Sequence, residues 1–182
     1  RGGTAIFTQP PMPIKCAGAP QKAMYLSADH WHRSGRLKNI DIHFCNAGGV
    51  LFGVKDYVPA LMEYVKKYDA TLDFFHNLVA VDGPAKKATF DVKEPEKEPR
   101  RVEMEFDMMH VCPPQTAPDF IRVSPLADQA GWVDVDQATL RHKSFDNIWA
   151  LGDVMNARLP VPLRPTGKRT ARRRVHCVLP AR

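Results

Sequence analysis

Several common signatures of function are missing from this sequence. Its 182 residues contain no run of 18 apolar residues, so no segment is expected to span a membrane. The four cysteines, Cys16, Cys45, Cys112 and Cys177, form no CxxC pair, which argues against both a zinc site and a disulfide framework. No G-x-G-x-x-G is present, the glycine turn that brings a backbone close to a dinucleotide pyrophosphate. We therefore expect no metal, and a reducing compartment.

Acidic residues are missing from residues 157–182, which hold seven Arg and one Lys. Removing those eight from the 26 Lys and Arg leaves 18 basic residues against 20 acidic ones, so the net charge of +6 arises entirely in this segment. The remainder lacks the basic excess that nucleic-acid binding requires, and we expect no nucleic-acid partner for it. We interpret residues 157–182 as a Pro/Arg-rich, frame-shifted or otherwise non-native tail; the alternative is a genuine basic tail for anionic lipid or nucleic acid. The start at Arg1, without Met, suggests a fragment or a processed chain.

Strand-like and helix-like patterns alternate along the first 75 residues. Short apolar runs predict strands near residues 4–11, 39–49 and 70–75, and apolar positions spaced by three or four predict helices that begin near Gln21 and Val54. This order is typical of a parallel sheet with crossover helices. Three short alternating runs in residues 77–106 then predict a β-meander, followed by a last strand in residues 107–114.

Three motifs resemble the sulfide:quinone oxidoreductase family, in its mitochondrial and bacterial type II branch. They are IKCAGAPQK (residues 14–22), HVCPP…PD (110–119) and AGWVDVD…NIWALGDV (130–154), and the resemblance extends from about Thr4 to Asn156. It implies an α/β, Rossmann-like flavoprotein with two dinucleotide-binding domains. Residues 1–118 would form the second Rossmann-like domain, with the meander inserted, and residues 119–156 would return into the FAD-binding domain. Members of this family carry FAD, oxidise sulfide and pass two electrons to membrane quinone, so the resemblance implies these partners and a peripheral position on a bacterial or mitochondrial inner membrane.

Cys16 is the candidate catalytic residue. It lies in PPMPIKCAGAP, a strand-to-helix turn with one Gly and four Pro, which a pyrophosphate cannot approach as it approaches a glycine turn. The positive end of the helix, with Lys15 or Lys22, would favour the thiolate, the form that attacks sulfur or a flavin. The alternative is a buried structural cysteine.

Gly152, Asp153 and Val154 are the candidate cofactor-binding residues. In the resembling family the Gly-Asp pair contacts FAD, with the Asp bonding a ribityl hydroxyl, and we expect Asp153 to follow a strand over residues 147–152. The second redox cysteine of the family would lie at or just after this pair, where this chain has Val154 and Met155. The family's redox cycle therefore cannot be written with Cys16 alone.

Three other residues are weaker candidates. Cys45 ends a strand and is expected in the core. Cys112 is expected to be a packing residue near the flavin. His110 is a possible site residue.

Two other functions remain open from the sequence. One is a flavin-dependent NADH dehydrogenase or disulfide reductase, which the missing glycine turn disfavours. The other is a non-catalytic domain with a basic, nucleic-acid-binding tail.

Overall fold

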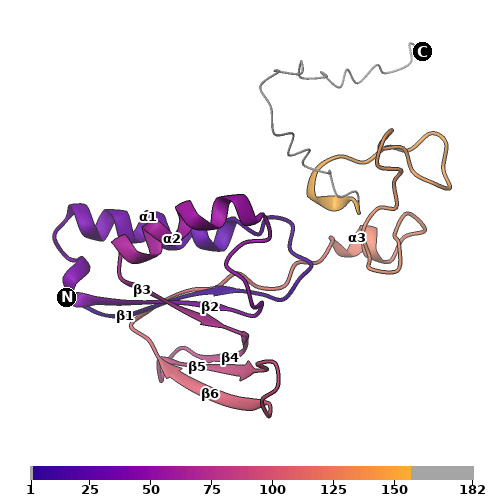
Figure 1. Cartoon of the computed structure of the whole chain (residues 1–182). Helices are drawn as coiled ribbons and strands as arrows, with labels where there is room; N and C mark the ends of the chain where they lie inside the picture. The colour runs from indigo at the N-terminus through magenta and orange to yellow at the C-terminus, as the bar shows by residue number, and fades with distance from the viewer. Residues whose placement is uncertain (1, 157–182) are drawn as a thin grey trace, which may run out of the picture. The chain divides into compact units, whose positions relative to one another are not determined.

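The computed structural model describes residues 2–156, and the chain divides into two compact units, Arg1–Ala117 and Pro118–Arg182 (Figure 1). The tail and Cys177 lie outside the described residues, so the interpretation of residues 157–182 stays a prediction. The assignment of residues 1–118 and 119–156 to two flavoprotein domains also stays a prediction. No helix within residues 2–156 is long and apolar enough to cross a bilayer.

The first unit is built on a four-stranded parallel sheet. Its strands are β1 (Gly3–Gln9), β2 (Ile40–Asn46), β3 (Ala70–Phe74) and β7 (Met108–His110), in the order β3-β2-β1-β7. The crossovers contain the helices α1 (Ala19–Arg33) and α2 (Val58–Lys67). The 3-10 turn η1 (Leu37–Asn39) follows α1, and the 3-10 turn η2 (Lys55–Tyr57) precedes α2. The predicted α/β, Rossmann-like class is confirmed.

Alternate residues of β1 divide the packing between the two faces of this sheet. Ala5 and Phe7 are buried together with Phe44 of β2 and Met24 of α1, on the face that the two helices cover (Figure 1). Ile6 is buried on the opposite face. Because both faces are covered, the strand reads as a continuous apolar run, as parallel strands commonly do.

The opposite face is covered by an antiparallel meander instead of helices. Its strands are β4 (His76–Asp82), β5 (Lys87–Val92) and β6 (Arg100–Glu105), paired in that order. Phe90 and Val92 of β5 are fully buried in one cluster with Ile6 and Cys45 of the parallel sheet. The predicted inserted meander is confirmed, and so is the expectation that Cys45 belongs to the core.

The second unit contains little regular structure among its described residues. It has a short helix, α3 (Asp119–Arg122), and a 3-10 turn, η3 (Gly152–Val154). The strand predicted over residues 147–152 is wrong: only Trp149 pairs, in an isolated bridge with Arg141. The opposing segment turns at Leu140, where φ is 59°. A partner that turns back so sharply cannot continue a ladder, which needs successive extended residues on both sides.

Candidate redox site

The candidate site lies at the carboxyl ends of β1 and β7. These two strands are parallel neighbours, with Phe7 opposite His110 in the register. From β1 the chain proceeds to β2 and β3 on one side, and it returns to β7 on the other side. The β1–β7 pair is therefore the point where the strand order reverses, and open α/β sheets bind their ligands beyond the carboxyl ends of the strands at this point.

Cys16 lies on the loop that leaves β1 at this edge. Its side chain is exposed, and its carbonyl accepts a 3.0 Å hydrogen bond from the amide of Ala19, the first residue of α1. The N-cap is Gly18, which has an ordinary φ of −86°, and an added Cβ there would meet nothing closer than Phe52 at 4.0 Å. The glycine is thus not used for a strained turn of the kind that lets a phosphate approach the backbone. The structure places an accessible thiol at this turn.

The loop that leaves β7 is tied to the β1 loop. The amide of Lys15 donates to Oε1 of Gln115 at 2.6 Å, and the amide of Cys112 donates to Oγ1 of Thr8 at 3.2 Å. These two bonds connect residues about a hundred positions apart in the sequence. The first bond joins the Cys16 loop to the loop after β7, and the second fixes Cys112 to the end of β1.

Cys112 is half-buried at this edge and has two polar neighbours. Its Sγ lies 4.0 Å from Nδ1 of His110, whose ring stacks on Phe7. Burial is the larger cause that raises the pKa of the Cys112 thiol, and a Coulomb interaction with Cys16 is the smaller one. From the sequence Cys112 was expected to be a packing residue near the flavin, and its place beside the Cys16 loop becomes visible only from the strand order.

A cavity of about 220 Å³ opens beside Cys112. It is lined by the ends of β1 and β7 and by residues 77–81 of β4, and its walls are mostly apolar: Pro10, Val79, Val111 and Pro113 are among them. A space of this size and character admits a small, weakly polar molecule.

Cys45 does not belong to this site. It is fully buried, and its Sγ is 3.9 Å from Oδ2 of Asp73. Burial is the larger cause and the Asp73 carboxylate the smaller one in raising the pKa of this thiol well above its ordinary value. A thiol that stays protonated and inaccessible is unreactive, which fits a structural role.

The candidate cofactor residues Gly152, Asp153 and Val154 form η3 in the second unit. Gly152 has φ 78°, which favours glycine, and both Gly152 and Asp153 are exposed. The amide of Val133 donates to the carbonyl of Val154 at 2.9 Å, so the turn is held from one side by main-chain bonds.

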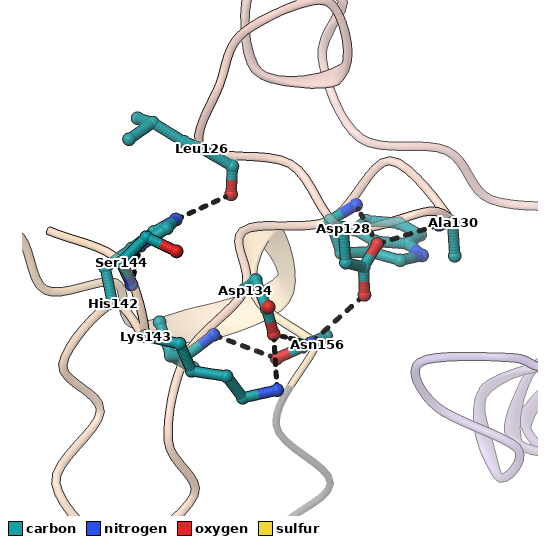
Figure 2. Close-up of polar contacts among 10 residues, drawn as sticks. Leu126, Asp128, Ala130, Asp134, His142, Lys143, Ser144 and Asn156 are labelled. Atoms are coloured by element: carbon teal, nitrogen blue, oxygen red, sulfur yellow. Dashed lines mark hydrogen bonds and ion pairs between the residues drawn. The ribbon is translucent and has the colours of Figure 1, made fainter.

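Asn156 fixes the chain that follows this turn (Figure 2). Its Nδ2 donates to Oδ1 of Asp134 at 2.7 Å and to Oδ2 of Asp128 at 3.1 Å, and its Oδ1 accepts from the amide of Val135 at 3.2 Å. Lys143 lies 2.7 Å from the same Asp134 oxygen. The hydrogen bond from Lys143, followed by that from Asn156, outweighs burial and lowers the pKa of Asp134. Asn156 was not recognised from the sequence as a residue that positions this turn.

No family model matches the chain. Curated relatives do match it: a mouse (Mus musculus) protein named sulfide:quinone oxidoreductase, mitochondrial, is 43% identical over 154 residues, which cover 85% of this chain and 34% of the relative. Proteins of the same name from Dictyostelium discoideum and Schizosaccharomyces pombe are 39% and 38% identical, covering 85% and 84% of this chain and 33% of each relative. This chain belongs to the sulfide:quinone oxidoreductase family. It spans about a third of the length of these relatives.

Solved structures agree with this family membership at the level of the fold. The sulfide:quinone oxidoreductase of Aquifex aeolicus matches with a TM-score of 0.64 at 15% identity, over 85% of this chain and 36% of that one. Thioredoxin reductase of T. acidophilum matches with a TM-score of 0.55 at 12% identity, over 86% and 46%. At such identities these likenesses concern the fold alone.

Proposed function

We propose that the whole protein oxidises sulfide, that it takes up sulfur on Cys16, and that it passes two electrons through FAD to a membrane quinone. The observation that carries this proposal is the accessible Cys16 at the sheet's switch point, within a segment 43% identical to a protein named for this activity. The exposure of the thiol is what a cysteine that accepts external sulfur needs, and a structural cysteine is more often buried.

In this proposal the chain's own residues hold and present sulfur. The Cys16 thiolate would carry the sulfur as a persulfide at the carboxyl edge of the sheet. The bond between Lys15 and Gln115 would keep the loop in place while the sulfur is exchanged. FAD, when bound, would accept the electron pair that sulfide gives up.

The residues of η3 fit one part of a flavin contact. An added Cβ at Gly152 would meet nothing within 4 Å, and the carboxylate of Asp153 is exposed, so a hydroxyl-rich ligand could approach the turn and donate to Asp153. Gly152 and Asp153, with the amide of Val154, would hold the ribityl chain. The pyrophosphate would need residues other than these, because no G-x-G-x-x-G occurs in this chain.

Quinone is lipid-soluble, so we place the whole protein at a membrane surface as a peripheral protein. This placement follows from the proposed electron acceptor, and the relatives named above are mitochondrial proteins by name.

The proposal is tested in a full-length protein that carries this segment. Cys16→Ser should abolish sulfide-dependent quinone reduction and leave FAD bound, because the thiol and the flavin contacts belong to different residues. Cys45→Ala is the matched control and should retain activity. If Cys16→Ser retains near-normal activity, Cys16 is structural and the proposal fails.

A further inference from the structure

Two thiols lie at one ligand-binding edge of the first unit. Cys16 follows β1 and Cys112 follows β7, and these strands are adjacent and parallel, with Ala5, Ile6 and Phe7 opposite residues 108–110. Parallel neighbours end at the same edge, so the loops that follow them meet there. The 95 residues between the two cysteines are therefore closed into a loop by the sheet itself.

The two loops are also fixed to each other beyond the strand ends. The Lys15 amide is bonded to the Gln115 side chain. Lys15 immediately precedes Cys16, and Gln115 lies three residues after Cys112. The Cys112 amide is bonded to Thr8 of β1. Each cysteine is thus within a few bonds of a cross-loop anchor, which limits how far the two sulfur atoms can separate.

The two thiols differ in how exposed they are and in their polar neighbours. Cys16 is exposed, so its sulfur can attack an external disulfide. Cys112 is half-buried beside the cavity, with Nδ1 of His110 4.0 Å from its sulfur. A histidine nitrogen at this position can accept the thiol proton as Cys112 becomes a nucleophile.

We propose that Cys16 and Cys112 form a reversible disulfide at the β1–β7 edge, so that Cys112 is the second redox thiol of this chain. Within residues 2–156 the remaining cysteine, Cys45, is buried in the core, so Cys112 is the thiol at this edge that can pair with Cys16. The pair itself does not depend on the proposed function.

The pair forms by two thiol–disulfide exchanges with a low-molecular-weight disulfide. The Cys16 thiolate attacks one sulfur of oxidised glutathione, a mixed disulfide forms on Cys16, and one glutathione thiolate leaves. Cys112 gives its proton to His110 and attacks Sγ of Cys16, which releases the second glutathione. One glutathione disulfide is reduced to two thiols, and two protein thiols are oxidised to one disulfide, so electrons and atoms balance.

Sulfide could open the same bond, a use that rests on the proposed function. Hydrosulfide would attack Sγ of Cys16, form a persulfide there, and release the Cys112 thiolate. Because Cys16 is exposed, hydrosulfide could reach its sulfur from solvent.

The test uses the full 182-residue chain with Cys177→Ser, so that the cysteine outside the described residues cannot exchange. The reduced chain is incubated with about 0.1 mM oxidised glutathione, the remaining thiols are alkylated at low pH, and peptides are analysed by mass spectrometry. We expect a Cys16–Cys112 cross-link in roughly tenfold excess over glutathionylated Cys16, because a thiol held nearby has an effective concentration in the mM range. Cys45 should be recovered reduced.

Two variants and one condition complete the test. Cys112→Ser should trap the glutathione mixed disulfide on Cys16, while Cys45→Ala should leave the cross-link unchanged. In urea the preference for the 16–112 pair should disappear, which ties it to the folded state. Glutathionylation of Cys16 without a cross-link in the native chain, or the same mixture of pairs in native chain and urea, would overturn the proposal whether or not the whole protein oxidises sulfide.

Discussion

The amide of Lys15 donates a 2.6 Å hydrogen bond to Oε1 of Gln115, a residue 100 positions later in the chain. This bond joins the loops that carry Cys16 and Cys112. A single neutral hydrogen bond of this kind contributes about 0.5–1.5 kcal/mol.

Gln115→Ala should therefore weaken the Cys16–Cys112 disulfide. We expect the ratio of cross-linked to glutathionylated Cys16 to fall by about two- to tenfold, which is the loss of that one bond expressed as an equilibrium. The measurement is the same peptide analysis. Gln137→Ala, at an exposed position of the second unit, is the control and should not change the ratio. An unchanged ratio in Gln115→Ala would show that the bond does not hold the loops.

Asn156→Ala should loosen the segment around η3. The substitution removes hydrogen bonds to Asp134, Asp128 and the Val135 amide, two of which involve carboxylates. We expect a local loss of about 1–3 kcal/mol. Hydrogen exchange of the Val133 and Val135 amides should accelerate by about 10- to 100-fold. Asn147→Ala, at an exposed position, should leave these rates unchanged, and equal rates in both variants would contradict the positioning role of Asn156.

His43 should make the stability of the chain depend on pH. Its Nδ1 lies 2.8 Å from Asp73 and its Nε2 3.1 Å from Asp41. The hydrogen bond with Asp73 is the largest cause and outweighs burial, and Asp41 adds to it, so the pKa of His43 is raised above 6.5. The folded state then holds this proton more tightly than the unfolded state. The stabilisation is complete below about pH 6.5 and is lost as the pH rises through the folded-state pKa.

Urea unfolding at a series of pH values measures this effect. The free energy of unfolding should fall between pH 6 and pH 8 in the native sequence, and His43→Gln should reduce that slope. Gln137→Ala, at an exposed position without a titratable side chain, is the control and should keep the slope. Equal slopes in the native chain and in His43→Gln would exclude His43 as the titrating group.

NADH and NADPH should not bind in the first unit. The approach to its strand-to-helix turn carries Pro10, Pro11 and Pro13, which have no amide to donate, and the turn itself carries side chains where a pyrophosphate would lie. Calorimetry on a full-length protein containing this segment should show no saturable heat with NADH. Binding in the micromolar range, competed by adenosine diphosphoribose, would favour the NADH dehydrogenase alternative over the proposed function.

The spacing of apolar residues along the sequence was sufficient to predict the helix and sheet layers of the first unit. The spacing of Met24 and Ala28 and the run Ala5–Phe7 report burial directly, because burial on one face or both faces determines which positions are apolar. The segment around Trp149 has a similar apolar pattern, yet it pairs only once. A strand exists only with a partner, and the turn at Leu140 that limits the partner is a backbone property that the apolar pattern of the segment does not report.

The relationship between Cys16 and Cys112 was not predictable from spacing. It depends on β7 joining the sheet beside β1, on the side opposite to β2, after the chain has formed the whole meander. Similar strand patterns are compatible with β7 beside β3, which would place Cys112 at the far edge. Only the strand order brings the two thiols to one place.

The strand order also implies a sequence of events during folding. The meander strands β4, β5 and β6 are consecutive and pair through short connections, so their pairing costs little loop-closure entropy. Pairing of β7 with β1 must close a loop of roughly a hundred residues and gains only a three-residue strand. We expect that pairing to form late and to open first, so that the two thiols become neighbours only when the rest of the unit is already native.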